Sequence, residues 1–495
     1  MHDQAITVRF PADAPYAMLA DQRTLALVAE LHEQFAPRLL DLMEQRRQRQ
    51  NAYDNGDWPH SIPPVSTDNW LAGGAAQVLR DRRVEWHCSA DDDSLPEALY
   101  SAASTVVVDL CELLPVDGAA LTALAAIHRA LKASAQLPRN ALIFGMRELC
   151  CREPLMLWKT APAHAALVDV AFFLGHSAAL QDAICLKLSQ LESAAEAELW
   201  RDILKYLESA GIVAPDQINA TLAIETVPAV FAIDTLMYAL KDYVAALTLD
   251  HSSCFASLVR AFREFPQFVL PDLSELTGST HLLQRWEILL VQHAHRRGVL
   301  AIGSPARWQA RHADRDNRFF GRLRAENERQ IQAGFDGIGV ADEVFVAAAR
   351  EVFDRLMPGQ HQLHQLRGDM HIVGADLLQV PKGKITESGL RACLAVALQG
   401  LLALAEGRSA LILDQRRETP ASIELAAGQL RHWVSHATGV LDDGRIVDEE
   451  FFQGVLEDEA AKLDTVGIDV AERAQCLSDF VLGRTSAAGL LPNFA

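Results

Sequence analysis

The sequence lacks any uninterrupted apolar run of the roughly 18 to 20 residues that a membrane-spanning helix needs. Its first residues, MHDQAITVRF, also lack the basic segment followed by an apolar one that is typical of a secretory signal. We therefore expect a cytoplasmic protein without a membrane partner.

Basic residues are scarce compared with acidic ones. The chain has 45 Lys and Arg against 65 Asp and Glu, which gives a net charge of −20. Such a charge disfavours binding to the polyanionic backbone of nucleic acids and to anionic membrane surfaces. We expect no nucleic-acid partner, and any phosphate-bearing ligand must find a local basic pocket.

Cysteine pairs at CxxC spacing are absent, because the eight cysteines are scattered along the chain. The sequence therefore predicts neither a disulfide framework nor a zinc site. The neighbours Cys150 and Cys151 offer a thiol nucleophile, but the only candidate bases are His164 and His176, by loose proximity in the sequence. We favour inert, buried thiols there.

The two ends of the chain differ in pattern from its middle. Residues 22–50 repeat apolar side chains at helical spacing with an interruption at Pro37, and a stretch rich in Pro, Gly, Asp and Asn follows up to about residue 74. We expect residues 1–80 to form a helical segment with a linker. After Pro381 strand signals stop and amphipathic helices follow, so residues 381–495 are predicted to form a separate helical domain.

Between residues 81 and 380, short β-branched apolar runs alternate with amphipathic helices. Apolar strands joined by helix-length connections indicate a parallel sheet. More than about 250 residues of this alternation favour a (β/α)₈ barrel. A doubly wound sheet is the alternative, although no Gly-rich dinucleotide-binding motif follows an early strand. The predicted strands lie at residues 83–88, 104–111, 140–146, 219–226, 245–250, 298–304 and 335–341.

Several strings resemble the malate synthase family, in its shorter A-type isoform, from about residue 22 to the C-terminus. They include DRRVEW (81–86), ATLAIETVPAVFAIDTLMYAL (220–240), GFDGIGVA (334–341), DLLQVPKGKITESGLR (376–391) and QLRHWVSHATGVLDDGRIVDEEFF (429–452). The resemblance implies a TIM barrel with an N-terminal helical clasp and a C-terminal helical plug. It also implies an acyltransferase that condenses acetyl-CoA with glyoxylate and uses Mg²⁺ at the barrel mouth.

The resemblance also implies where a metal would bind. The family holds Mg²⁺ with a Glu and an Asp, which fall on Glu225 and Ser253 of this chain. A neutral hydroxyl is a poorer ligand than a carboxylate for a hard cation. Asp250 is a second candidate, either as a ligand for the same cation or as the cap of the following helix. We expect weak Mg²⁺ binding through Glu225 and Asp250.

At its catalytic positions the chain departs from the family. The catalytic arginine falls on Gly145 and the catalytic aspartate on Thr419. Arg147 could replace the arginine, but a shift of two residues favours a structural or phosphate-binding role. Glu418 could replace the base. Thr419 followed by Pro420 is typical of a helix N-cap with proline at the first helical position.

Other substitutions fall in motifs that the resemblance places at the same barrel mouth. Asp109 is kept from the family's D-F-E-D-S string and is a further catalytic candidate. Gly303 and Arg307 lie in GSPAR, where the family has G-G-M-A-A beneath its thioester cofactor, so they are candidates for binding an acyl-CoA. Pro305 and Arg307 should remodel that pocket.

These substitutions leave three functional hypotheses. We favour a repurposed acyl-CoA/2-oxoacid enzyme of the Claisen type that is not an efficient malate synthase, because the altered mouth gained polar rather than only apolar groups. The second hypothesis is a catalytically inactive pseudoenzyme with a binding or regulatory role. The third is an ordinary malate synthase whose motifs are locally shifted. The first and third have a CoA thioester and a small carboxylate as partners.

Overall fold

Eight parallel strands form the centre of the structure, a computed structural model that describes residues 6–63, 69–88, 95–133, 140–176, 184–309, 317–463, 469–486 and 490. Their order is β10-β9-β8-β7-β4-β3-β2-β11. The edge strands β10 and β11 meet through a parallel bridge between Ile302 and Gly337, so the sheet closes into the predicted barrel. The strands are β2 (Val84–Cys88), β3 (Thr105–Asp109), β4 (Ala141–Gly145), β7 (Ile184–Leu188), β8 (Ile218–Ala223), β9 (Val244–Thr248), β10 (Leu300–Ile302) and β11 (Ile338–Val340).

Seven of these strands overlap the predicted runs, with β8 and β9 beginning one residue earlier than predicted, and β7 was missed. Its sequence, ICLKL, has one β-branched residue, and Lys187 interrupts the apolar run. All five residues of β7 are nevertheless buried, because Lys187 points into a polar interior rather than to solvent. Because this inward-facing residue is charged, β7 lacks the continuous apolar run from which the other strands were predicted.

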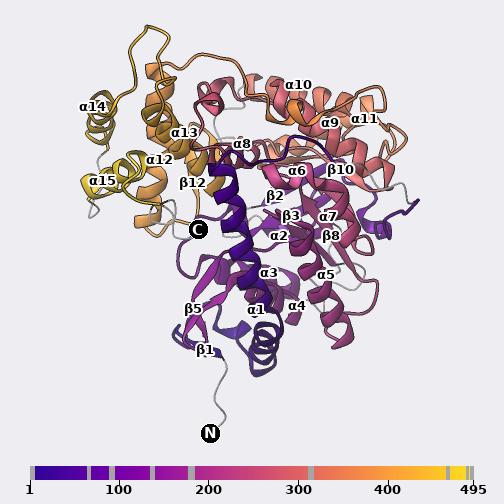
Figure 1. The fold of residues 1–495 in the computed structure, drawn as a ribbon. Helices are drawn as coiled ribbons and strands as arrows, with labels where there is room; N and C mark the ends of the chain where they lie inside the picture. The colour runs from indigo at the N-terminus through magenta and orange to yellow at the C-terminus, as the bar shows by residue number, and fades with distance from the viewer. Residues whose placement is uncertain are drawn as a thin grey trace.

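Helices surround the barrel and connect its strands (Figure 1). Residues 227–239 form two short helices separated at Ala232, and β9 begins at Val244. The helices are α2 (Leu95–Ala98), α3 (Ala119–Ala133), α4 (Ala165–Gly175), α5 (Ala194–Ser209), α6 (Val227–Phe231), α7 (Ile233–Ala239), α8 (His251–Ala261), α9 (His281–Arg296), α10 (Asn317–Ala333) and α11 (Val346–Leu356). Short 3₁₀ turns cover Ala17–Leu19, Gln77–Leu79, Leu110–Glu112, Pro266–Phe268, Leu273–Glu275, Glu343–Phe345 and Gly374–Leu378.

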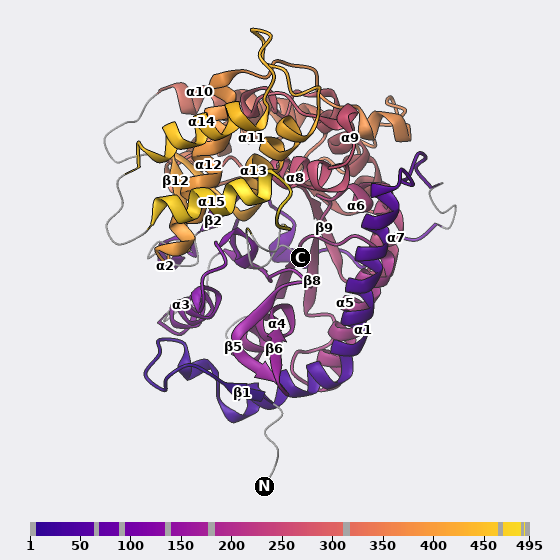
Figure 2. The same cartoon turned by 60° about the vertical axis from the view of Figure 1, so that its left-hand side comes forward.

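The N-terminal helix α1 (Gln22–Asp54) runs along the outside of the barrel beside α4 and α5 (Figures 1 and 2). It continues through Pro37, where the sequence predicted an interruption. Pro37 and Glu33 are both exposed, so water can solvate the Glu33 carbonyl that proline leaves without an N–H donor. Outside the barrel, β1 (Ile6–Val8), β5 (Arg152–Trp158) and β6 (Ala161–His164) form a small antiparallel sheet that was not predicted.

The C-terminal part consists of α12 (Glu387–Ala405), α13 (Pro420–Ser435), α14 (Glu449–Ala460) and α15 (Val470–Val481), which gather at one end of the molecule (Figures 1 and 2). They share a core of their own. A hairpin of β12 (Leu411–Leu413) and β13 (Arg416–Glu418) corrects the expectation that no strand follows Pro381. Only α12 is long and apolar enough to span a membrane among the described residues, and 56% of its apolar window is buried, as in a core helix.

Helix α13 docks this C-terminal part on the barrel. The indole of Trp433 donates to the Leu270 carbonyl at 2.9 Å, and the Gln429 amide donates to the Pro271 carbonyl at 2.6 Å. A side chain at Gly428 would meet Val259 of α8 at 2.6 Å, so glycine permits the close contact of the two helices. The N-terminus of α13 thereby lies over the ends of the barrel strands.

We expect that deleting the chain after Lys382 yields insoluble or molten protein, because it exposes the α8 face and the carbonyls that α13 covers. Apolar burial stabilises by about 25 cal/mol per Å², so a loss over a whole helix face is large. Thermal denaturation and size-exclusion chromatography of the fragment would measure this. A soluble fragment that melts cooperatively would contradict the docking.

Candidate functional site

The barrel strands end around a small hollow of about 30 Å³ that α13 covers. Five strands bring ionisable side chains to it. Asp109 ends β3, Lys187 lies in β7, Glu225 follows β8, Asp250 follows β9 and Arg307 follows β10. All five are buried. Ser253 and Thr419 also line this hollow, so the structure brings together most of the predicted site and adds Lys187, which the sequence analysis missed with its strand.

Lys187 and Asp109 form a buried ion pair across the hollow. The Lys187 ammonium donates to Asp109 Oδ2 at 2.6 Å, and Asp109 Oδ1 accepts from the Cys111 N–H at 2.9 Å. Burial alone would lower the pKa of Lys187, but the neighbouring carboxylates of Asp109, Glu225 and Glu112 raise it above its usual value. The lysine is therefore charged at neutral pH.

Gly145 has no side chain, and the ion pair occupies the space where a side chain would lie. Gly145 lies in β4, in register with Asp109 of β3 on one side and with Lys187 of β7 on the other. A Cβ at this position would come within 2.3 Å of Asp109 Oδ1. The position where the family resemblance predicts an arginine is thus crossed by the Lys187–Asp109 pair.

Asp250 caps a helix and forms an ion pair at the same time. Its Oδ1 accepts from the Ser253 N–H at 2.9 Å, at the N-terminus of α8, while Oδ2 accepts from Arg307 Nη2 at 2.9 Å. Burial acts to raise the pKa of Asp250, but Arg307 and the cap hydrogen bond lower it to about 2. Of the two predicted roles, the structure contains the cap.

A chain of alternating charges continues from Arg307 into the barrel. Arg307 Nη1 lies 3.2 Å from Glu112, which accepts from His87 Nδ1 at 3.2 Å. The other ring nitrogen, His87 Nε2, lies 3.8 Å from Glu85 Oε2. Glu85 Oε1 in turn lies 2.6 Å from Arg82 Nε. Burial lowers the pKa of His87, but the hydrogen bonds to both glutamates outweigh it and raise that pKa.

Glu225 differs from Asp109 and Asp250, since it forms no ion pair within 4 Å among the described residues. Its Oε1 accepts from the Gln190 N–H at 3.1 Å. Burial raises the pKa of Glu225 to about 7, with Lys187 opposing and the charges of Asp250 and Asp109 adding to the effect. The side chain therefore exchanges its proton near neutral pH.

Thr419 has the role that the sequence predicted for it as a helix cap. It is the N-cap of α13, its Oγ1 accepts from the Ser422 N–H at 3.4 Å, and Pro420 follows in the first turn. Glu418 lies in β13 and borders the larger cavity beside the hollow instead of the hollow itself. Neither residue takes the place of a base in the hollow.

Arg147 lies outside the hollow and is held by two carboxylates. Its Nη2 donates to Asp169 at 2.6 Å and its Nη1 donates to Glu153 at 2.8 Å, and both carboxylates are buried. This arrangement fits the structural alternative better than a catalytic role. Gly303 is also placed for packing, because it lies at the seam of the barrel and a Cβ there would meet Gln330 at 1.7 Å.

Two larger cavities adjoin the hollow on opposite sides. One of about 270 Å³ shares Cys111, Glu148 and Pro420 with it. The other, of about 780 Å³, shares Asp250 and Arg307 with it and extends between α10 and the C-terminal part. The hollow thus shares lining residues with both cavities.

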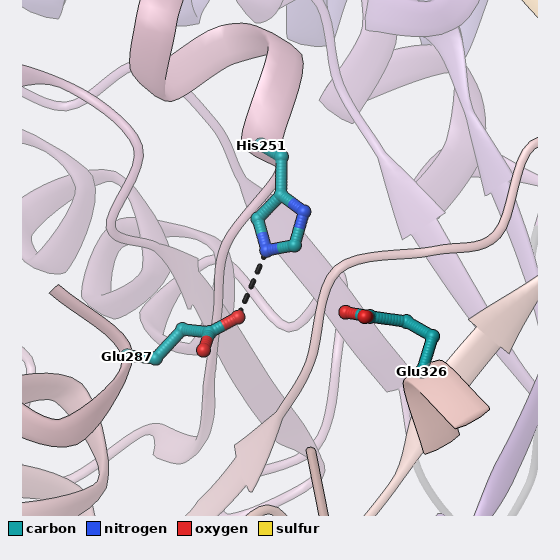
Figure 3. A group of neighbouring side chains, drawn as sticks. All are labelled: His251, Glu287 and Glu326. Carbon is teal, nitrogen blue, oxygen red and sulfur yellow. Dashed lines mark hydrogen bonds and ion pairs between the residues drawn. The ribbon is translucent and has the colours of Figure 1, made fainter. Parts of the chain in front are cut away.

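A second group of possible metal ligands borders the larger cavity (Figure 3). The ligand atoms of His251, Glu287 and Glu326 lie within 4.8 Å of one another, and His251 Nε2 is 2.9 Å from Glu287. Arg329 already pairs with Glu287 and with Glu326, at 2.5 Å in each case. A cation would have to displace this guanidinium, so we assign the group to a salt-bridge network that connects α8, α9 and α10.

The two histidines that the sequence offered as bases for Cys150 and Cys151 have other hydrogen-bond partners. His164 hydrogen-bonds to Arg152, and His176 hydrogen-bonds to Thr24 and the Leu19 carbonyl. The Cys151 thiol lowers the pKa of Cys150 to about 6, with Arg46 adding to the effect. Cys150 does not line the central hollow. The arrangement agrees with thiols outside the candidate site.

Comparison with known proteins places this geometry in a family. The chain matches the family models "Malate synthase, TIM barrel domain" over residues 144–380 and "Malate synthase, N-terminal domain" over residues 5–66. It is 30% identical to a malate synthase of Myxococcus xanthus, over 94% of this chain and 92% of that protein. It is 29% identical to a glyoxysomal malate synthase of Candida tropicalis, over 90% of this chain and 86% of that protein.

Among solved structures, a malate synthase of Haloferax volcanii in a ternary complex with pyruvate and acetyl-CoA aligns with a TM-score of 0.47 and 12% identity, over 83% of this chain and 99% of that chain. The sequence relationship is more specific. Two family models match in order along the chain, and the Myxococcus xanthus protein is aligned over nearly its full length. This chain therefore belongs to the malate synthase family.

Proposed function

We propose that this protein is a divergent enzyme of its family, which binds a CoA thioester and a small carboxylate at the barrel mouth and joins or cleaves a carbon–carbon bond other than that of malate. The observation that carries this proposal is the set of five buried ionisable side chains around one hollow. Burying charged groups costs free energy even when they are paired. Their concentration at the catalytic end of a TIM barrel supports a chemical role.

The cavities support a two-part ligand. The space of about 780 Å³ is within the range of small-molecule binding sites, and Arg322 and Arg416 line it, as phosphate recognition requires. The central hollow is suited to a group of a few atoms. We infer that the thioester arm of an acyl-CoA enters from the large cavity and that the carboxylate substrate binds in the hollow.

The side chains in the hollow suggest new assignments for the acid–base chemistry. Glu225 has the pKa that general base catalysis near neutral pH favours, so we assign it the removal of a proton next to the thioester carbonyl. Lys187 is a fixed cation and would stabilise the negative oxygen that develops. Thr419 cannot accept a proton at neutral pH and keeps only its capping role.

The family's Mg²⁺ does not fit the side chains of this hollow. Asp250 already accepts from Arg307 and from the N–H and hydroxyl groups of Ser253, and Ser253 provides no carboxylate of its own. Lys187 and Arg307 also bring two positive charges into the same small space. Mg²⁺ exchanges its waters for carboxylate oxygens only reluctantly. We therefore assign no step to a metal ion.

A binding or regulatory role without catalysis is the second candidate. It is favoured by the size of the hollow, about 30 Å³, which has room for one or two waters. It is also favoured by the ion pairs that already neutralise Asp109 and Asp250. A substrate would require movement of α13 away from the strand ends.

We expect no malate formation at rates above about 1 s⁻¹ from acetyl-CoA and glyoxylate, because a lost base and a lost oxyanion partner each remove about 10² to 10⁴ in rate. Release of the CoA thiol measures the rate. The same assay with other acyl-CoAs and 2-oxo acids tests the proposal.

Turnover that depends on a 2-oxo acid and falls at least about a hundredfold in Glu225→Gln supports the proposed enzyme. Acyl-CoA binding without turnover on every substrate favours the binding protein instead. Efficient malate formation would contradict both assignments.

Titration calorimetry should detect only weak Mg²⁺ binding, at millimolar concentrations or above, and Glu225→Gln should abolish it. The reason is that Glu225 directly follows a barrel strand and, unlike Asp109 and Asp250, forms no ion pair with an arginine or lysine within 4 Å among the described residues. Asp369→Asn, an exposed change far from the mouth, is the matched control. Tight Mg²⁺ binding that persists in Glu225→Gln would show that other side chains are the metal ligands.

The difference in stability between Glu225→Gln and the wild type should depend on pH. The folded pKa of Glu225, about 7, lies above its ordinary value of 4.5, so the wild-type protein loses stability as pH rises through this window. The loss amounts to at most about 3 kcal/mol for a shift of this size. In EDTA, the melting temperature of the variant should therefore rise relative to that of the wild type between pH 5 and pH 8. A difference that does not change with pH would be evidence against the buried, metal-free carboxyl.

A further inference from the structure

Lys187 and Arg307 line the same hollow as Glu225 and Ser253, the two positions on which the family's metal ligands fall. We propose that Lys187 and Arg307 form a cationic site that holds the carboxylate of a small 2-oxo acid without any metal. This inference rests on the proposed function, in that it takes the hollow as the substrate site. It adds how the substrate is recognised.

The first observation is the placement of Lys187. Asp109, Gly145 and Lys187 lie side by side in register on three adjacent strands, and the ion pair passes over the glycine. Any side chain at residue 145 would collide with Asp109. Gly145 is therefore a requirement for the lysine to be held at the mouth.

The second observation is the donor capacity that Lys187 keeps. Within the described residues its ammonium makes one hydrogen bond, to Asp109 Oδ2. An ammonium has three N–H donors, so two are left for a ligand. Lys187 lines the central hollow together with Ser189 and Glu225, which is where a bound anion would have to lie.

The third observation concerns Arg307 on the other side of the hollow. Its Nε and Nη2 donate to Asp250 at 3.2 and 2.9 Å, and its Nη1 lies 3.2 Å from Glu112. These carboxylates fix the plane of the guanidinium. Of its five N–H donors, two remain available, and the side chain borders both the hollow and the large cavity.

The ligand class follows from this arrangement. A carboxylate beside a carbonyl presents a compact set of acceptors with one negative charge, which suits two cations. The hollow of about 30 Å³ has room for one or two waters, so α13 must move away from the strand ends to admit such a ligand. An ammonium polarises a carbonyl less strongly than Mg²⁺ does, because it has half the charge and lies farther from the oxygen. The site should thus bind a 2-oxo acid more weakly than a metal site would, and independently of metal.

The test is calorimetric titration of the full chain with pyruvate, and with oxalate as a rigid mimic, in EDTA and in excess Mg²⁺. We expect the same affinity in both buffers and a loss of at least about tenfold in Lys187→Met. Lys187→Met alone leaves Asp109 as a buried charge without its partner, which can impair folding. The double variant Lys187→Met/Asp109→Asn removes both charges and is measured for this reason. Lys241→Met, which removes a lysine stacked on Tyr238 away from the mouth, should bind like the wild type.

Binding that requires Mg²⁺, or that persists in folded Lys187 variants, overturns the inference while leaving the proposed substrate site in place. Absence of binding in both buffers also overturns it. An acyl-CoA titration in parallel then separates the two proposals: if acyl-CoA binds, the proposed function survives without this cationic site, and if neither ligand binds, both are wrong. Arg307→Lys keeps the charge but loses the planar fork, and unchanged affinity in that variant would exclude Arg307 from the site.

Discussion

The ion pair of Lys187 with Asp109 is the interaction on which the rest of the mouth depends. Two charges this deeply buried are stable only as partners, since removing either one leaves the other without compensation. The pair needs the space above Gly145, so a side chain at that position and the pair exclude each other. Glycine at residue 145 is therefore a steric condition for this ion pair.

Further pairs of opposite charges extend through the barrel. Arg307 is held by Asp250 and Glu112, and His87 connects Glu112 to the pair of Glu85 and Arg82. These charges all have an opposite neighbour, whereas Glu225 and Glu148 form no ion pair within 4 Å among the described residues and burial raises their pKa values. The polar interior is therefore organised around fixed protein cations that are paired with carboxylates.

Family membership and chemistry are separate questions here. The malate synthase relationship covers the barrel, its seam and the docking of α13, which depend on apolar burial and on backbone hydrogen bonds. The mouth depends on a few side chains, and these differ. Fold does not determine function, since different sites can be built on the same barrel. The docked α13 still closes the site, although Thr419 at its N-terminus only caps the helix.

The sequence by itself determined the barrel, seven of its eight strands, the C-terminal helices and the capping role of Thr419, because helix caps and apolar periodicity are local properties of the chain. It did not reveal β7 or Lys187, since an inward-facing lysine looks like a break in a strand. Only the tertiary structure decided that Arg147 binds Asp169 and Glu153 and that Glu418 borders another cavity. Which charges meet depends on register between strands that are distant in sequence, and that register is set by closure of the barrel.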